Sequence, residues 1–211
     1  MLQTYTLRYM SLADIPLVVD VDRLSFPMPW SARSYIFEVS DNQAGHMIVL
    51  EVVPETAPAR GLMGMFQRLG GLSRQSAIVG YGGFWLIDGE AHVSTIAVHP
   101  DHRRRGLGEL LLAGMLSRGI AHRAEYSVLE VRVSNEPAIN LYRKYEYEIV
   151  GQRKRYYRDN DEDAFLMHLA PLDKAYQGRL AARLDNLRAR VDYTDALTRN
   201  PADRRRNAAN R

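Results

Sequence analysis

The order of apolar and polar side chains divides most of the first 170 residues into short strands and helices. Alternation or a short apolar run is typical of a β-strand, whereas apolar residues three and four positions apart are typical of a helix. These patterns predict strands at residues 4–9, 46–53, 78–87, 91–98, 127–133, 147–157 and 164–169. Between the third and fourth strands lie Asp88 and Gly89, which predict the turn of an antiparallel hairpin.

Helical spacing fills most of the intervals between these strands. Ser11 is placed to begin a first helix, which ends before Pro27 and Pro29 because proline cannot continue it. Ser31 can cap a second, short helix that ends near Val39. Further helices are expected in the leucine-rich run up to about Ile120, over residues 135–145, and around the stripe formed by Leu180, Leu184 and Leu187.

A helix between the strands at 91–98 and 127–133 requires a crossover, which makes those two strands parallel. The fold class is therefore α/β (α+β), with a mixed, mostly antiparallel sheet of six or seven strands flanked by helices. We expect one domain over residues 1–170, because 211 residues are few for two independent cores.

Two segments fall outside this pattern. Residues 54–77 form a basic insertion rich in proline and glycine, and its four internal glycines each cost about 1 kcal/mol of helix stability, so no stable free helix is expected there. Residues 171–211 carry 10 basic and 5 acidic side chains, a net charge of +5, whereas the rest of the chain has a net charge of −2. We expect this basic extension to be helical in part and disordered at its end.

The composition excludes several classes of protein. The sequence has no cysteine, which excludes disulfides, thiolate metal sites and a cysteine nucleophile. It has neither an 18-residue apolar run nor the basic and apolar start of a secretory signal, so we expect a cytoplasmic protein. His99 and His102 lack the partners of a known metal motif, and no metal is expected.

The stretch `IAVHPDHRRRGLG` leads from a strand into a helix and has the features of an anion site. The first N–H groups of a helix and its dipole attract an anion, and Gly106 and Gly108 would let that anion approach the backbone. Arg103, Arg104 and Arg105 would add bidentate contacts that suit a pyrophosphate. The lysine of a P-loop and the three-glycine dinucleotide fingerprint are both missing. A solvated basic loop is the alternative.

The pattern Arg-x-x-Gly-x-Gly, formed by Arg103, Gly106 and Gly108, resembles the acetyl-coenzyme A signature of the GCN5-related N-acetyltransferase (GNAT) family. The stretch `LEVRVSNEPAINLYRKY` is similar to the second signature of its RimI-type branch, the ribosomal-protein-alanine N-acetyltransferases, which acetylate protein N-termini. The resemblance covers about residues 4–170. It implies the GNAT fold, in which two parallel central strands splay apart.

The resemblance also implies that acetyl-coenzyme A is the cosubstrate. Its pantetheine arm would lie along the backbone of Ile96, Ala97 and Val98, and its diphosphate would bind the arginines, the glycines and the backbone of Leu107. The Val98 N–H would also face the developing oxyanion. Asn135 matches a side chain that contacts the coenzyme. The alternatives are a plain buried strand for the first three residues and a helix N-cap for Asn135.

Two further side chains receive catalytic roles from the resemblance. Glu130 matches the general base for the incoming amine, and Tyr142 matches the acid that protonates the departing thiolate. Without the resemblance, the sequence pattern predicts that Glu130 is a strand carboxylate paired with Arg132. It likewise predicts that Tyr142 is a core aromatic residue, because of its helical spacing.

One short stretch departs from the family pattern. The family usually has Leu-Gly-Phe after the helix of its second signature, whereas this chain has Tyr145, Glu146 and Tyr147. Glycine there takes a left-handed conformation that ends the helix. Glu146 would adopt that conformation at a cost of about 1 kcal/mol, or the turn differs.

The leading hypothesis is direct transfer, in a ternary complex, to the N-terminal α-amino group of a protein, in particular a ribosomal protein. The lack of cysteine argues against an acetyl-thioenzyme. The segment from Phe26 to Trp30 resembles the family's acceptor-side loop, and packing of two helix ends is the alternative. Lysine and small amines are alternative acceptors. A hypothesis of a different class is a coenzyme-binding module whose basic tail docks on RNA or the ribosome.

Overall fold

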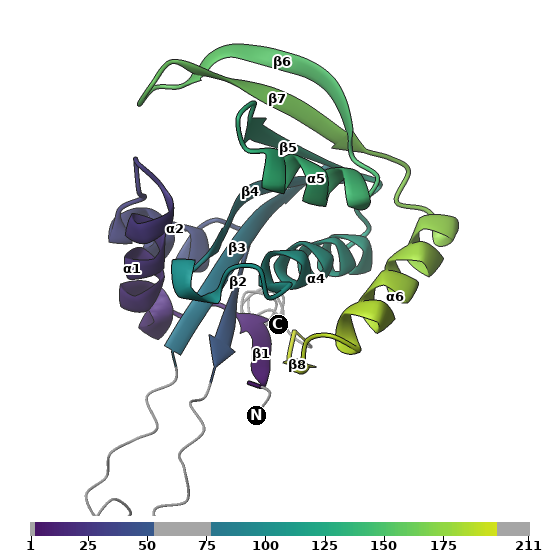
Figure 1. Cartoon of the computed structure of the whole chain (residues 1–211), viewed down its shortest axis with the longest axis horizontal. Coiled ribbons are helices and arrows are strands. Elements are labelled where there is room, and N and C mark those ends of the chain that lie inside the picture. Colours follow the sequence, from purple (N-terminus) through teal and green to yellow (C-terminus); the bar gives the residue numbers. More distant parts are fainter. Residues whose placement is uncertain (1–2, 53–76, 198–211) are drawn as a thin grey trace, which may run out of the picture.

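The computed structural model describes residues 3–52 and 77–197. Except for Ala77, the predicted insertion lies outside these residues, and so do the last 14 residues of the extension. Figure 1 labels the α-helices and the strands. The elements are β1 (Tyr5–Tyr9), η1 (Leu12–Asp14), α1 (Ile15–Ser25), α2 (Ala32–Ser40), β2 (Gly45–Val52), β3 (Ala77–Ile87), β4 (Glu90–Val98), η2 (Pro100–His102), α4 (Leu107–Ala121), β5 (Tyr126–Arg132), α5 (Glu136–Lys144), β6 (Glu148–Tyr157), β7 (Glu162–Leu169), α6 (Lys174–Arg188) and β8 (Tyr193–Asp195).

The eight strands of the described residues belong to one mixed sheet, in the order β6-β7-β5-β4-β3-β2-β1-β8. The pairs β4–β5 and β1–β8 are parallel, and the other pairs are antiparallel. The predicted fold class is confirmed, and so is the parallel central pair. The sheet has one strand more than the largest predicted number, because the three-residue β8 is too short to give a periodic signal.

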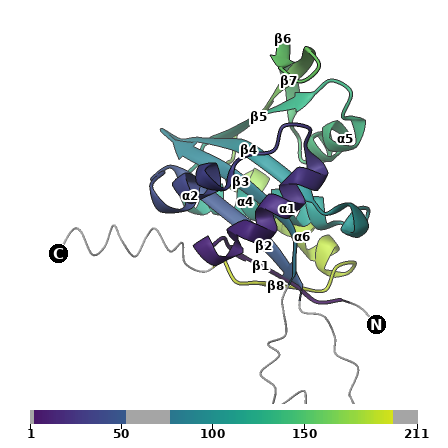
Figure 2. The ribbon, with the colours of Figure 1, turned by 90° about the vertical axis from the view of Figure 1, so that its left-hand side faces the viewer.

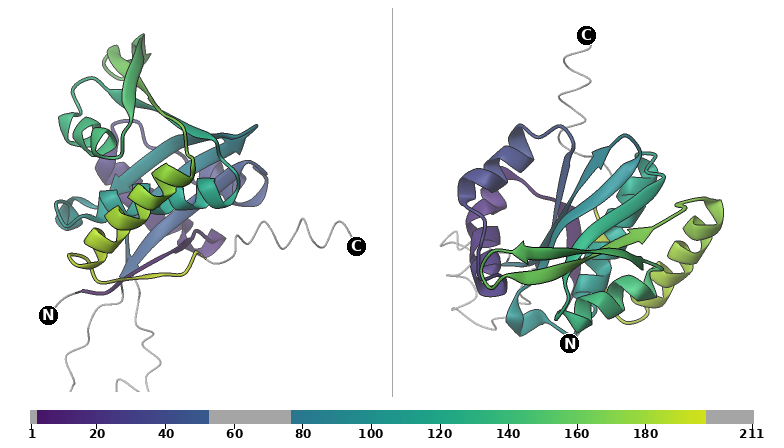
Figure 3. Two further views of the ribbon diagram at one scale, coloured as in Figure 1. Left: turned by 90° about the vertical axis from the view of Figure 1, so that its right-hand side faces the viewer. Right: turned by 90° about the horizontal axis from the view of Figure 1, so that it is seen from above.

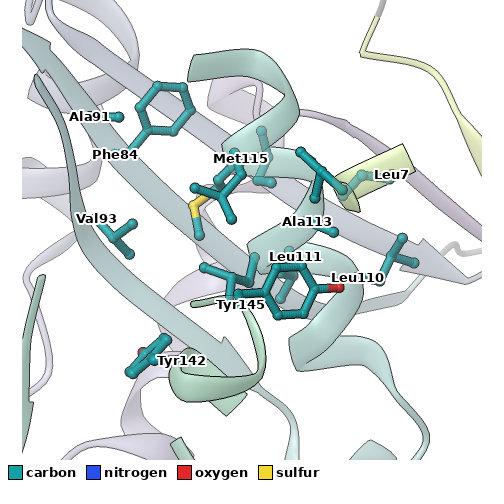
Figure 4. Packing of buried hydrophobic residues seen from close by; sticks show 14 of the residues in the cluster. Leu7, Phe84, Ala91, Val93, Leu110, Leu111, Ala113, Met115, Tyr142 and Tyr145 are labelled. Carbon is teal, nitrogen blue, oxygen red and sulfur yellow. The ribbon is translucent and has the colours of Figure 1, made fainter. Parts of the chain in front are cut away.

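Helices cover both faces of the sheet. Helices α1 and α2 pack on one face, seen toward the viewer in Figure 2, and α4 packs on the other face against β2, β3 and β4. Helix α4 is apolar on most sides because α6 lies against it from outside, as the left view of Figure 3 shows. Figure 4 shows Leu110, Leu111 and Met115 of α4 packed with Phe84 of β3 and with Tyr145.

The two parallel strands β4 and β5 stay together over only four residue pairs, from Glu90–Tyr126 to Val93–Leu129. A bulge follows at once in β4, because Thr95 pairs with Gly83 while Val93 pairs with Phe84, and Ser94 is the extra residue. A bulge bends its strand. Within the described residues, β4 has no strand on its β5 side beyond Val93, so a gap opens between the two strands.

The first part of the basic extension is packed into the same core. Helix α6 forms where the leucine stripe predicted a helix, and its Tyr176, Leu180 and Leu187 are buried in the cluster that contains α4. Strand β8 then pairs with β1. The packed unit therefore continues past residue 170 as far as Leu197, which is itself buried.

Candidate active site

The strand-to-helix turn with the features of an anion site is built around Gly106, which precedes α4 with a φ of 81°. Glycine adopts this left-handed conformation without steric strain. The first N–H groups of a helix have no partner inside it, and the helix dipole favours an anion at this end. The side chain of Leu107 is buried, so this residue offers only its backbone to a ligand.

The three arginines surround this turn at the surface. Nε of Arg103 donates to the carbonyl oxygen of Val98 at 3.0 Å, and Nη2 of Arg105 donates to that of Asp101 at 3.0 Å. Arg104 lies between them with a φ of 60°. These hydrogen bonds hold two guanidinium groups beside the start of α4 while leaving them in solvent, where they can contact an anion.

The end of β4 runs along the gap and leads into this turn. On one side its Ile96, Ala97 and Val98 pair with β3. On the other side the strand β5 has moved away, so backbone groups there are available to an extended ligand, apart from the Val98 carbonyl oxygen that Arg103 already binds. A Cβ added to Gly108 would lie 3.9 Å from Leu141 and 4.0 Å from Val98, which places α5 beside the same gap.

Glu130 lies on β5 opposite a histidine that sequence reasoning did not single out. Its side chain is only 6% exposed, and Oε2 lies 2.9 Å from Nε2 of His92 on β4. Oε1 lies 3.0 Å from Nη1 of Arg153 on β6. The hydrogen bond with His92 lowers the pKa of Glu130, and the same bond raises the pKa of His92. The pair is therefore an ionised carboxylate beside an imidazole that holds a proton more readily than usual.

The alternative pairing of Glu130 with Arg132 is wrong. The guanidinium of Arg132 instead binds Asp159 at 2.7 Å and Glu162 at 2.9 Å. Arg132 stands at the end of β5, where the β6–β7 turn is within its reach, whereas Glu130 faces the neighbouring strands. No sequence pattern indicated that His92 contacts Glu130, because the two residues lie 38 positions apart. Only the register of β4 against β5 brings them together.

Tyr142 lies on α5 and packs in the core cluster with Leu129 and Val131. Burial raises the pKa of its hydroxyl, so that the proton is held firmly. Side chains alternate along β5, and Glu130 therefore lies on the opposite face from Leu129 and Val131. The structure thus places the two catalytic candidates on opposite faces of the sheet.

Asn135 and Glu146 flank α5 at its two ends. Asn135 caps the helix, since its Oδ1 accepts a hydrogen bond from the Ala138 N–H at 3.3 Å. Asn135 is also exposed and can still reach a ligand. Glu146 takes the left-handed conformation with a φ of 69°, so the chain keeps the turn in which the family usually has glycine.

A buried carboxylate fixes the loop between α1 and α2. Asp22 is 1% exposed, and its Oδ2 accepts from the Trp30 N–H at 2.6 Å while its Oδ1 accepts from the Tyr81 hydroxyl. Trp30 packs on Tyr35, with ring centroids 5.4 Å apart. Packing of helix ends therefore accounts for Trp30. It does not account for Phe26 or Met28, which are exposed.

A pocket of about 470 Å³ lies beside this loop. Trp85 forms one of its walls and donates its indole N–H to Glu38 of α2 at 3.0 Å. The Trp85 ring also meets the edge of His92, with centroids 5.6 Å apart. The pocket is therefore next to the His92–Glu130 pair, on the face of the sheet that α1 and α2 cover.

Over residues 3–52 and 77–197, no three His, Cys, Asp or Glu side chains are grouped as a metal site would require. Over the same residues, no helix is long and apolar enough to span a membrane.

Comparisons with known proteins define the class. Residues 65–147 match the model of the acetyltransferase (GNAT) family. A Bacillus subtilis protein described as a ribosomal protein bS18-alanine N-acetyltransferase is 33% identical over 160 residues, which are 76% of this chain and 91% of the relative. The chain therefore belongs to the GNAT family and is an acyltransferase, as the two signatures predicted.

Other relatives agree with the RimI-type resemblance. An N-alpha-acetyltransferase of Sulfurisphaera tokodaii is 33% identical over 80% of this chain and 93% of its own length. Among solved structures, the ribosomal-protein-S18-alanine N-acetyltransferase of Escherichia coli superposes with a TM-score of 0.62 at 24% identity, over 80% of this chain and 94% of that one. The last comparison, at this identity, supports the fold alone.

Proposed function

We propose that this protein transfers an acetyl group from acetyl-coenzyme A to the N-terminal α-amino group of a protein. The spatial arrangement of three structural features supports this proposal. A strand that has parted from its parallel neighbour leads directly into an arginine-rich helix start, and a buried carboxylate–imidazole pair lies across the two strands. Relatives that match most of this chain are N-alpha-acetyltransferases.

The residues at the gap fit acetyl-coenzyme A, which when bound would supply an acetyl group activated as a thioester. The left-handed Gly106 and the open side of Gly108 leave backbone N–H groups accessible to a diphosphate, and the arginines supply positive charge. The free side of Ile96 to Val98 can hydrogen-bond amides in the manner of an added strand. Asn135 has an exposed side chain at the start of α5.

Glu130 is suited to accept the proton of the incoming ammonium, directly or through water. An α-amino group has a pKa near 8 and is partly neutral at pH 7.5, so a base has little more to supply. The lowered pKa of Glu130, caused first by its bond with His92, keeps it ionised. His92 holds the carboxylate in place.

Tyr142 is suited to give its hydroxyl proton to the departing sulfur. Burial raises the pKa of this hydroxyl, which keeps it protonated but also makes it a weaker acid than a free tyrosine. A base and an acid on opposite faces of the sheet match a reaction in which the amine arrives from one side of the gap and the coenzyme lies on the other. No cysteine is present to carry the acetyl group, so we propose direct transfer in a ternary complex.

The acceptor side favours a peptide over a polyamine. The loop residues 26–31 contain no acidic side chain, and Phe26, Met28 and Tyr156 present apolar surface. A polyamine needs carboxylates as counter-ions, whereas a peptide can use apolar contacts. The name of the Bacillus relative points to ribosomal protein bS18 as its acceptor, and a ribosomal protein is our proposed acceptor class.

An acceptor panel tests this proposal. Release of coenzyme A would be followed with three acceptors: a peptide with a free N-terminal alanine, the same peptide with a blocked N-terminus and a lysine, and spermidine. We expect turnover with the first acceptor only. Turnover confined to the second or the third would replace the proposal with the lysine or small-amine alternative.

The hypothesis of a docking module with a basic tail loses support over the described part of the tail. Arg179 and Arg183 bind Glu146, and Arg190 binds Glu109. Charges engaged in this way are less available to a polyanion.

A further inference from the structure

The C-terminal segment, defined here as residues 172–197, touches both helices that border the proposed coenzyme site. The matched family model ends at residue 147, so this segment lies outside it. Helix α6 packs against α4, and the chain then passes the start of α4 before β8 pairs with β1. Its path therefore runs beside the turn that we propose binds the diphosphate.

The first contact is with the turn itself. A Cβ on Gly106 would lie 3.1 Å from Cγ2 of Val191 and 3.4 Å from Cδ1 of Leu187. Both side chains are buried. One side of the left-handed glycine is thus packed against the C-terminal segment, which fixes the backbone whose N–H groups would face an anion.

The second contact is a buried carboxylate in the first turn of α4. Glu109 accepts from Nζ of Lys144 at 2.7 Å, from the Tyr145 hydroxyl at 3.2 Å, and from Nη2 of Arg190 at 3.3 Å. Burial opposes its ionisation, yet the bonds from Lys144 and Arg190 hold the pKa of Glu109 below its usual range. Glu109 therefore joins α4, α5 and the C-terminal segment as an anion.

An ionised Glu109 so close to a diphosphate site would repel the ligand unless cations compensate it. Lys144 and Arg190 are the two cations that bind it. Lys144 lies within the residues that match the GNAT family model, whereas Arg190 lies in the C-terminal segment outside them. Arg190 thereby keeps the field at the start of α4 positive.

The third contact fixes the end of α5. The carboxylate of the left-handed Glu146 receives Arg179 at 2.8 Å and Arg183 at 2.7 Å, and the Tyr176 hydroxyl donates to the Tyr145 carbonyl oxygen at 3.2 Å. Glutamate in place of the family's usual glycine thus has a partner in α6.

We propose that the C-terminal segment is a clamp that positions the coenzyme-binding turn, with Arg190 and Val191 as positioning residues that act through Glu109 and Gly106. This inference rests on the proposed function, because it assigns a purpose to contacts with the proposed diphosphate site. The segment has its own anchor in the sheet, where the Tyr5 N–H donates to the Asp192 carbonyl oxygen at 2.9 Å and the Ala196 N–H to that of Leu7 at 2.8 Å.

The test compares Arg190→Ala, Arg190→Lys and the control Arg188→Ala in the full chain. Arg188 stands on the same segment but pairs with Asp185 within α6. Calorimetry would give the Kd for acetyl-coenzyme A, and kinetics would separate its KM from kcat. We expect Arg190→Ala to raise both Kd and KM about fivefold with kcat and Tm nearly unchanged, the size of one partly exposed charged contact. Arg190→Lys should recover most of the affinity, and Arg188→Ala should match the wild type.

A double variant separates electrostatic positioning from general loosening. If Arg190 acts by compensating Glu109, its removal in a Glu109→Gln background should change Kd by less than twofold. Wild-type affinity in Arg190→Ala, or an equal fivefold loss in both backgrounds, would overturn the clamp as described. A wild-type protein that does not bind acetyl-coenzyme A would instead overturn the proposed function.

Discussion

At the scale of single residues, the proposed chemistry centres on a carboxylate held between an imidazole and a guanidinium group. Glu130 contacts His92 on one side and Arg153 on the other, and it is almost fully enclosed. An amine that approaches this carboxylate competes with the exposed Arg153 more readily than with His92, which is half-buried on the neighbouring strand. If Glu130 is the base, as we propose, the amine therefore approaches it from the side of β6.

Glu130→Gln tests the role of the base. The amide keeps the shape of the side chain but cannot accept the ammonium proton, so we expect kcat to fall by about 10²- to 10⁴-fold. The Kd for acetyl-coenzyme A should not change, because Glu130 lies on the other face from Tyr142. A variant with wild-type kcat would remove Glu130 from the mechanism.

The His92–Glu130 pair also predicts a pH dependence of stability. The pKa of His92 is raised above its ordinary value of 6.5 in the folded state, chiefly by the bond with Glu130. The stabilisation is therefore complete below pH 6.5 and is lost as the pH rises through the folded-state value. Urea unfolding of wild type and His92→Gln from pH 5.5 to 8.5 should show a difference that shrinks with rising pH. A constant difference would contradict this account.

At the scale of elements, the sequence patterns located nearly all of the structure. The seven predicted strands and the helix stripe of α6 are all present. Most of them bury apolar side chains, and burial leaves a periodic signal, whereas β6 is exposed along nearly its whole length. The pairing of His92 with Glu130 and the contact of Arg190 with Glu109 left no such signal. Both depend on strand register and on how α6 packs, which are set by the whole fold.

The start of α4 provides the prediction at this scale. Gly106→Ala places a Cβ in a left-handed conformation and close to Val191. We expect the free energy of unfolding to fall by about 1–2 kcal/mol, which urea titration would measure. The Kd for acetyl-coenzyme A should also rise, since the turn proposed to bind the diphosphate changes. Gly178→Ala, in open space on α6, is the matched control and should be neutral or stabilising.

At the scale of the whole molecule, the acetyltransferase fold and the C-terminal segment share one core. Leu187 is fully buried between α4 and the segment that follows α6. Leu187→Ala should therefore lower the free energy of unfolding by about 3 kcal/mol, as measured by urea titration. A loss of unfolding free energy below about 0.5 kcal/mol would mean that the C-terminal segment contributes little to the core. By the same reasoning, truncation after residue 170 should prevent folding rather than leave an active body.

The most direct measurement of the central claim locates the acetyl group on an acceptor that offers both kinds of amine. A peptide that begins with alanine and carries one internal lysine would be incubated with the protein and acetyl-coenzyme A, and fragment masses would assign the modified nitrogen. The account predicts a single acetyl group on the α-nitrogen of the alanine, formed by the wild type and strongly reduced in Glu130→Gln. An acetyl group on the lysine alone, or equal yields from both proteins, would contradict it.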